Sequence, residues 1–308
     1  MNAEPPEPLR TPATATIPRD PTGPPAGEGQ DIKAVPLRHP LRWLAALVIV
    51  VLIAMAVHLL VTNPNWQWDV VGQYLFSSPV VDGVKRTLLL TVLAEIVGIV
   101  FGVVLAIMRL SPNPVLSWTS RVYTWTLRGI PPLVLLLFIY FLSALLPTLS
   151  LGIPFGPSFV EASTNKLITQ QVAAVAGLGL AQAAYVSEIV RGGILSIPPG
   201  QTRAALAMGM KPRQVMWRIV LPQAMRVVVP PLGNEVISMF KATSLTSVIA
   251  YSELLTTVQV IYARTFEQIP MLVVACLWYG VLTTVATIVQ SLIERRLGRS
   301  LKTPKGDR

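Results

Sequence analysis

Residues 196–222 read SIPPGQTRAALAMGMKPRQVMWRIVLP, and this stretch carries the most distinctive pattern in the chain. Strong helix formers fill Gln201 to Met208, and Gly209 follows at a place where helices commonly end in a left-handed residue. Pro212 suits the first position of a second helix, which we expect to end near Leu221 because another proline follows it. The stretch therefore predicts two short helices joined by a tight turn.

Two alanines and a methionine share one side of the first short helix. Ala204, Ala205 and Met208 are spaced three or four residues apart, and residues at that spacing are neighbours on a helix surface. The small alanine side chains would allow a second protein surface to approach the backbone closely. The alternative is a loop helix that rests on its own bundle, and spacing alone does not separate these two interpretations.

Long apolar runs lie on both sides of this stretch. A membrane-spanning helix needs about 20 mostly apolar residues. Six segments of the chain are candidates: Leu41 to Val61, Val84 to Leu110, Tyr123 to Leu146, Thr169 to Ile189, Pro231 to Val258 and Pro270 to Ile293. The third is interrupted by two prolines, Pro131 and Pro132, where we expect a kink. The expected fold class is an all-α integral membrane protein with about six transmembrane helices.

The composition agrees with a membrane protein. Apolar residues make up 52% of the 308 residues, charged residues only 13%, and the mean hydropathy is +0.58. A soluble domain usually has about a quarter charged residues, so lipid must cover much of this surface. The net charge of +10 lies mainly at the ends of the apolar runs, without interleaved aromatic residues. This distribution disfavours nucleic acid as a partner and indicates contact with membrane lipid headgroups.

The sequence shows no catalytic machinery that we recognise. It has no Gly-x-x-x-x-Gly-Lys-[Ser/Thr] phosphate loop, no His-Glu-x-x-His pair, and no nucleophile with a plausible histidine base. The two histidines, His39 and His58, have no cysteine or carboxylate neighbours at metal-ligand spacing. We therefore expect no metal site, no cofactor and no enzymatic activity in this chain, so the energy for any transport would come from elsewhere.

Proline and charge divide the chain into regions. Residues 1–40 are rich in proline, alanine, threonine and glycine and lack apolar periodicity, which predicts a disordered tail. The regions that follow are an extra transmembrane helix (41–62), an extracytoplasmic loop (63–83), a main transmembrane domain (84–293) and a basic tail (294–308). Lysine and arginine are concentrated in the segments on the same side as both termini, which predicts cytoplasmic N- and C-termini.

The stretch 196–222 resembles the EAA loop of type I ABC importer permeases. The matching positions are Ala204, Ala205, Gly209, Ile219, Leu221 and Pro222, whereas Arg203 stands where the family pattern has glutamate. In that family the loop is a coupling helix that docks on a separate ATPase subunit. The resemblance therefore implies that the ATPase-docking residues are Gly200, Arg203, Ala204, Ala205, Met208, Gly209, Ile219, Leu221 and Pro222.

Further matches extend from about residue 80 to the C-terminus. Segments 128–133, 188–194, 230–235 and 241–249 are similar to segments of polar amino-acid permeases, although Ala242 stands where those relatives usually have aspartate. The resemblance implies a cell inner-membrane permease subunit that imports polar amino acids. It also implies three protein partners: a cytosolic ABC ATPase, a second permease subunit that is identical or different, and an extracytoplasmic solute-binding protein.

Several charged residues fall within the apolar runs, where they are costly unless they face the interior, pair or line a path. We expect Glu95, Lys241, Thr243 and Ser244 to line a translocation path, because a zwitterion needs both signs of charge. The alternative is that they form buried pairs that fix helix register. The alternative function is a stand-alone, ion-driven secondary transporter of small polar solutes, which would not need a docking loop.

Overall fold

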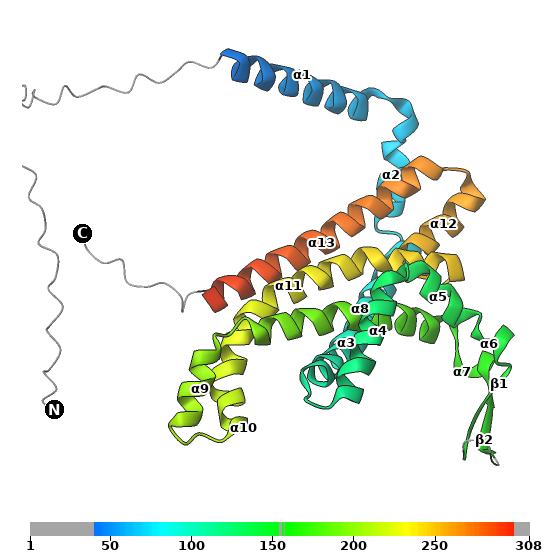
Figure 1. Cartoon of the computed structure of the whole chain (residues 1–308). Coiled ribbons are helices and arrows are strands. Elements are labelled where there is room, and N and C mark those ends of the chain that lie inside the picture. Colours follow the sequence, from blue (N-terminus) through cyan, green and yellow to red (C-terminus); the bar gives the residue numbers. More distant parts are fainter. Residues whose placement is uncertain (1–39, 154–155, 157, 299–308) are drawn as a thin grey trace, which may run out of the picture. The chain divides into compact units, whose positions relative to one another are not determined.

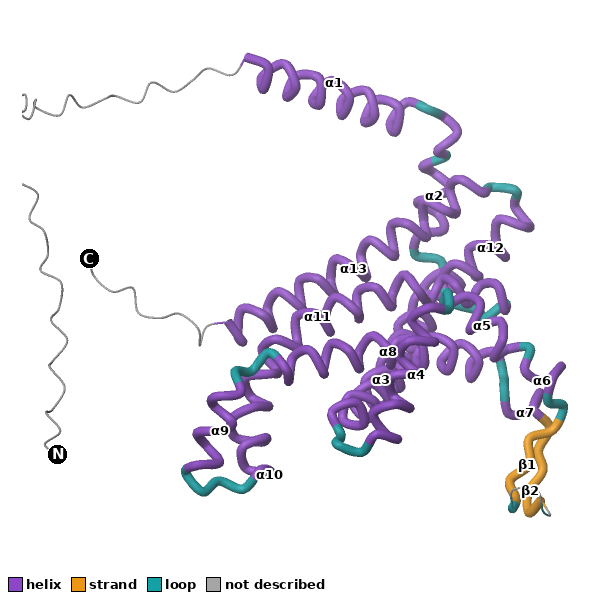
Figure 2. The backbone as a smooth tube through the Cα atoms, in the orientation of Figure 1, coloured by secondary structure: helices purple, strands orange, loops and turns teal. Residues whose placement is uncertain are grey.

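The computed structural model describes residues 40–298 except 154–155 and 157 (Figure 1). Within these residues helices predominate, and the strands are confined to one short hairpin (Figure 2). The chain divides into two compact units, Met1–Thr62 and Asn63–Arg308. The predicted disordered tail, apart from its last residue, and residues 299–308 of the predicted basic tail lie outside the described residues.

The first unit contributes one described helix, α1 (Pro40–Thr62). The first half of the second unit comprises η1 (Pro64–Trp66), α2 (Trp68–Leu75), α3 (Ser78–Leu110), α4 (Pro114–Gly129), α5 (Pro132–Tyr140), α6 (Leu142–Leu145), β1 (Thr148–Gly152) and β2 (Ser158–Ser163). The second half comprises α7 (Thr164–Leu167), α8 (Gln170–Leu195), α9 (Pro199–Ala207), α10 (Pro212–Val215), η2 (Met216–Val220), α11 (Leu221–Ala242), η3 (Thr243–Ile249), α12 (Leu254–Thr265) and α13 (Gln268–Gly298).

Among the described residues, four helices are long and apolar enough to cross a membrane: α1, α3, α8 and α13. Two bent pairs pass the same test when each is counted as one broken span, which brings the number to six. The prediction of an all-α membrane fold with about six spans is therefore confirmed. Large apolar side chains are exposed along α1, α3 and α13, as expected for surfaces that face lipid rather than water, whereas α8 is mostly buried inside the bundle.

The two broken spans differ from the sequence prediction. The expected kink at Pro131 and Pro132 is present, but it is a break of 102° between α4 and α5, and α4 already begins at Pro114. The span expected from Pro231 to Val258 is not a single helix. The helical stretch Pro212–Ile249, which contains α11 and η3, is bent by 48° relative to α12, and Ala250 before α12 has a left-handed backbone with φ of 55°.

α11 also begins earlier than predicted and continues through Pro230 and Pro231. A proline frees the carbonyl group four residues before it, here those of Arg226 and Val227, so contacts with neighbouring helices must help to hold this part of α11 in place. Here Gln290 of α13 donates a hydrogen bond to the carbonyl oxygen of Pro230 at 3.2 Å and another to Asn234 Oδ1 at 3.0 Å. These contacts fasten α11 to α13 across the proline pair.

α3 and α8 share the most extensive contact between described helices, because glycines allow their backbones to approach closely. A Cβ added at Gly98 would lie 2.6 Å from Gln182 Cγ, and one at Gly102 would lie 2.6 Å from Val186 Cβ. A Cβ at Gly179 would likewise meet Val97 at 2.7 Å. The contact points advance in the same direction along both helices, so α3 and α8 run parallel and their C-terminal ends lie at the same end of the bundle.

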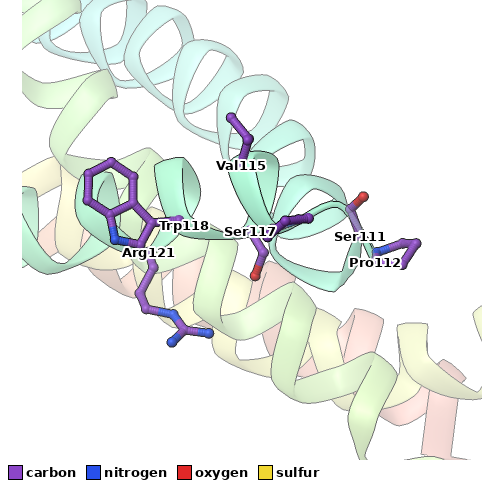
Figure 3. A pocket seen from close by; sticks show the side chains of 7 residues that line it. Ser111, Pro112, Val115, Ser117, Trp118 and Arg121 are labelled. Atoms are coloured by element: carbon purple, nitrogen blue, oxygen red, sulfur yellow. The ribbon is translucent and has the colours of Figure 1, made fainter.

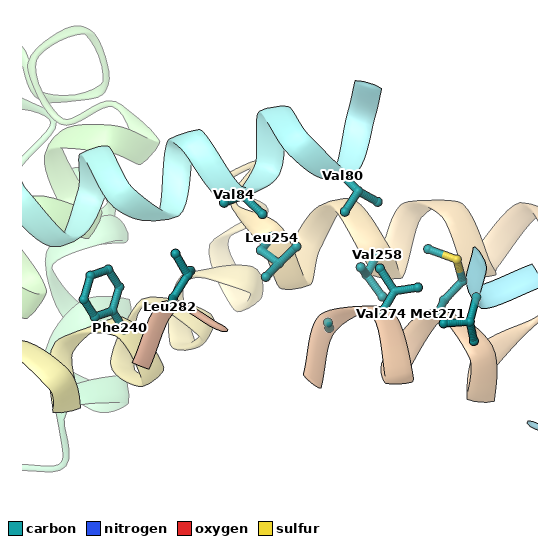
Figure 4. Close-up of a cluster of buried hydrophobic side chains, with 10 residues drawn as sticks. Val80, Val84, Phe240, Leu254, Val258, Met271, Val274 and Leu282 are labelled. Carbon is teal, nitrogen blue, oxygen red and sulfur yellow. The ribbon is translucent and has the colours of Figure 1, made fainter. Parts of the chain in front are cut away.

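Two apolar clusters hold the remaining helices. In the first, Val84 of α3 and Leu254 of α12 pack with Met271 and Val274 of α13 (Figure 4). The second joins α3, α5, α8 and the α11–η3 region around Leu90, Leu136, Leu178 and Met239. Between α6 and α7, β1 and β2 form an antiparallel hairpin with Thr148 opposite Ser163, an element that the sequence analysis did not predict.

Candidate functional site: the α9–α10 hairpin and the buried polar groups

The stretch 196–222 folds largely as predicted, with α9 and α10 joined by a turn (Figure 1). α9 begins at Pro199 and ends at Ala207. Gly209 then adopts the left-handed conformation, with φ of 82°, and the Met210 N–H donates back to the Ala205 carbonyl at 3.1 Å. No other atom lies near the position of a Cβ on this glycine, so the backbone dihedral rather than lack of space requires glycine here.

The expected end of the second helix near Leu221 is wrong. The chain passes from α10 through one π-helical segment, Met216–Val220, and continues without interruption into α11. Proline has no N–H and its ring clashes with the carbonyl four residues earlier, and the wider π turn accommodates such a residue. Pro222 therefore lies in the first turn of α11 instead of after a helix end.

Ala204, Ala205 and Met208 do not form one exposed face. Ala205 is buried against Val215 and Val220, in the small apolar cluster that holds the hairpin together. Ala204 is exposed, and Met208 is 85% exposed. Ala205 thus packs on its own bundle, as the second interpretation expects, whereas Ala204 and Met208 are solvent-exposed, and docking of a partner on them stays a prediction.

The other predicted docking residues divide in the same way. Gly200, Arg203, Gly209 and Pro222 are exposed, whereas Ile219 and Leu221 are half-buried.

Gln223, which was not among the predicted docking residues, connects the two ends of the hairpin. Its Nε2 donates to Gln201 Oε1 at 2.6 Å and to the Ile219 carbonyl at 2.9 Å. The hairpin is therefore fixed to the start of α11 as well as to its own core.

The four candidate path residues do not come together. Glu95 is buried on α3 and accepts a hydrogen bond from Gln182 Nε2 of α8 at 3.2 Å. Thr243 is fully buried, and its hydroxyl donates to the Phe240 carbonyl, so it does not line an open path in this structure. The Ser244 hydroxyl donates to the Lys241 carbonyl at 2.6 Å.

Lys241 is the candidate whose side chain remains open. It is exposed, and within the described residues it has neither an ion pair nor a side-chain hydrogen bond. No contact joins it to Glu95 in that part of the chain. The two charges that a zwitterion would need are thus present on different elements, α3 and α11, as separate groups.

A buried carboxylate that the sequence analysis did not assign to the site stabilises the second broken span. Glu253 is fully buried at the N-terminus of α12, where it accepts hydrogen bonds from the backbone N–H groups of Leu255 and Thr256 at 2.9 and 2.7 Å. The hydroxyl groups of Thr256 and Tyr279 also donate to it, at 2.9 and 2.7 Å. A carboxylate at a helix N-terminus also compensates the helix dipole.

The same break is attached to α3. The N–H of Leu254 donates to Thr87 Oγ1 at 3.1 Å, and both residues are fully buried. Because Glu253 and Thr87 already occupy the donors at the start of α12, this helix end serves the fold rather than a substrate anion. A carboxylate directly before an apolar run was the sequence signal that could have revealed this cap.

At the end of the bundle that carries the hairpin, Glu188 of α8 is the centre of a small ion cluster. Arg191 binds one of its oxygens through Nε at 2.9 Å and Nη2 at 2.7 Å. Arg109, at the C-terminal end of α3, approaches its other oxygen at 3.9 Å. Because α3 and α8 run parallel, these three side chains meet at one end of the helix pair.

The chain matches known proteins over most of its length. Residues 98–299 match the family described as "Binding-protein-dependent transport system inner membrane component". The chain is 42% identical to the arginine transport system permease protein ArgU of Corynebacterium glutamicum, over 89% of this chain and 86% of that protein. It is 36% identical to the L-cystine transport system permease protein TcyB of Bacillus subtilis, over 75% of this chain and 92% of that protein.

Solved structures agree with these sequence matches. The crystal structure of an amino acid ABC transporter with histidines superposes with a TM-score of 0.60 at 32% identity, covering 71% of this chain and 94% of that one. The inward-facing MetNI methionine ABC transporter gives a TM-score of 0.54 at 21% identity, over 72% of this chain and 99% of that one, and supports the fold alone. This chain therefore belongs to the binding-protein-dependent transport system inner membrane components, the multi-pass permease subunits of type I ABC importers.

Proposed function

We propose that this chain is the non-catalytic permease subunit of an importer for polar amino acids, driven by a separate ATPase that docks on the α9–α10 hairpin. One observation carries the proposal: the hairpin exposes Ala204 and Met208 while Ala205, next to them, locks it to its own core. An exposed face on a firmly held helix is suited to receive a partner and to transmit its movement.

The connections of the hairpin support a mechanical role. α8 leads into it on one side, and on the other side α10, the π segment and α11 form one continuous helical path into the bundle. The Gln223–Gln201 contact closes the loop between these two arms. A displacement of α9 would therefore move the inner ends of α8 and α11 together, the kind of rigid-body rearrangement that alternates access in transporters.

The proposed partners follow from the family. An ATPase and a solute-binding protein belong to such systems, and we propose a second permease subunit, identical or different, that completes the path. The relatives are named for arginine, L-cystine and glutamate/aspartate, so we propose an amino acid with a polar side chain as substrate. Glu95 and Lys241 remain the candidates for the path in this proposal.

We further propose that the end of the bundle bearing the hairpin faces the cytoplasm. Arg109, Arg191 and the basic residues of the hairpin all lie there, together with Arg295 and Arg296 at the end of α13. Such an excess of positive charge is typical of cytoplasmic segments. In this orientation the C-terminus is cytoplasmic and the β1–β2 hairpin is extracytoplasmic.

Cysteine cross-linking tests the docking surface with a matched pair of neighbours. The full permease, carrying Ala204→Cys or Ala205→Cys, is co-purified with its ATPase and treated with a short bifunctional thiol reagent. The exposed position is expected to cross-link to cysteines placed across the ATPase surface, and the buried one is not. Equal labelling of both positions, or none at Ala204→Cys in an actively importing complex, would contradict the proposed docking face.

A further inference from the structure

Three guanidinium groups line an open pocket at the junction of α3, α4 and α8. Arg109 comes from α3 and Arg121 and Arg128 from α4, and the pocket has a volume of about 540 Å³. One carboxylate, Glu188, also lines it. That carboxylate is already held by Arg191 at 2.7 Å, so it compensates little of the positive charge in the pocket.

None of the three arginines has its charge closely matched. Arg109 Nη2 lies 3.9 Å from Glu188, its buried Nη1 has no hydrogen-bond partner, and Arg121 and Arg191 lie close enough to repel it. Arg128 is placed over the ring of Tyr185, 5.4 Å from its centroid, which uses the face of the guanidinium and leaves its N–H groups free. Arg121 has no side-chain partner within the described residues. Such a pocket attracts an oxyanion, whose oxygens can accept hydrogen bonds from several guanidinium groups.

The surface beside the pocket is apolar. Val115, Trp118, Val122 and Trp125 are exposed on one face of α4, at 39–79%. A second pocket of about 640 Å³ adjoins the first through Arg121, and Figure 3 shows the indole of Trp118 next to the Arg121 side chain. Exposed tryptophans at the end of a span are typical of the membrane–water interface. A molecule bound across the two pockets would therefore contact guanidinium groups at one end and indole rings at the other.

We propose that this basic pocket binds the phosphate of an anionic phospholipid, with the acyl chains along the apolar face of α4. Basic pockets between transmembrane helices are suited to such headgroups. The pocket lies at the end of the bundle that bears the α9–α10 hairpin, so the bound lipid belongs to the leaflet on that side. The lipid holds α3, α4 and α8 together by neutralising charges that otherwise repel one another.

Native mass spectrometry of the full permease complex in detergent tests the site by titration with phosphatidylglycerol and phosphatidylcholine. The double variant Arg121→Gln/Arg128→Gln, at two exposed positions, is expected to weaken phosphatidylglycerol binding about twenty-five-fold, roughly five-fold for each charge. The control Arg295→Gln/Arg296→Gln removes the same charge from exposed residues at the end of α13, outside both the pocket and the hairpin, and is expected to change binding less than three-fold, on the order of one weak surface contact. Arg121→Lys/Arg128→Lys is expected to recover most of the affinity.

Three results would overturn the proposal. The first is equal affinity for phosphatidylglycerol and phosphatidylcholine, or unchanged affinity in the pocket variant. The second is displacement of the lipid by inorganic phosphate at an equal concentration, which would identify a free anion as the ligand. The third is a pocket variant that keeps its lipid but no longer co-purifies with the ATPase, which would make the pocket a protein contact. None of these readouts depends on transport or on the substrate.

Discussion

The buried carboxylate of Glu253 offers the sharpest test of how the second broken span is held. Glu253→Gln keeps the shape of the side chain and the two hydrogen bonds to Oε1, both from Thr256. The amide nitrogen then faces the two donors that bind Oε2, the backbone N–H of Leu255 and the hydroxyl of Tyr279. Each buried donor left without an acceptor costs about 1–3 kcal/mol, and the tyrosine hydroxyl can rotate away, so the expected loss is about 2–4 kcal/mol.

The assay is thermal unfolding of the purified permease in detergent, followed by tryptophan fluorescence. A loss of this size corresponds to a fall of the midpoint by about 3–6 °C for a chain of 308 residues, at about 1.5 °C for each kcal/mol. Asp82→Asn is the matched control: Asp82 pairs with Lys85 at 2.9 Å, but both side chains are more than half exposed, so the expected loss is below about 1 kcal/mol. In addition, Tyr279→Phe should cost stability in the native background and little or nothing in Glu253→Gln, because its acceptor is gone there. A midpoint for Glu253→Gln equal to that of Asp82→Asn would refute the capping role.

Two glycine substitutions give further predictions. Gly102→Ala should destabilise the permease by about 1–3 kcal/mol, because the new Cβ would lie 2.6 Å from Val186 Cβ. In the control Gly129→Ala the new Cβ meets no other atom, so this variant should be neutral or slightly stabilised. Equal melting midpoints of the two variants would contradict the close α3–α8 contact. Gly209→Ala should cost about 1–2 kcal/mol, because alanine is strained at φ of 82°, and should loosen the α9–α10 turn. Substrate-stimulated ATPase activity of the assembled complex should then fall, although the isolated permease stays folded. Full stimulation would show that the turn geometry is not needed for coupling.

The sequence alone was sufficient to predict those elements that depend on a local pattern of residues. Apolar length alone located α3, α8 and α13, and Gly209 and Pro212 correctly indicated the turn and the start of α10. The breaks were harder, because proline acts differently in different surroundings. At Pro131 and Pro132 the helix breaks by 102°, whereas Pro230 and Pro231 remain inside α11, where α13 supplies a side-chain contact that no local pattern reveals.

The candidate site was predictable in position but not in orientation. Spacing placed Ala204 and Ala205 on the same short helix, yet only the packing of Val215 and Val220 decides that Ala205 faces inward. Burial of Thr243 likewise depends on neighbours remote in sequence. Glu95 was expected to line a path, with a buried pair as the alternative, and the sequence could not name a partner for it. Gln182, which donates to it, is 87 residues away, and only the parallel packing of α3 and α8 brings the two together.

We propose above that ATP hydrolysis on a separate subunit drives this permease through the α9–α10 hairpin. The direct measurement is uptake of labelled amino acids into proteoliposomes that contain the permease, its ATPase and its loaded binding protein. We expect uptake with ATP, none with a non-hydrolysable analogue, and none from an imposed ion gradient alone. Uptake by the permease without its ATPase, driven by the gradient, would show that the permease is an ion-driven carrier and contradict ATP-driven transport.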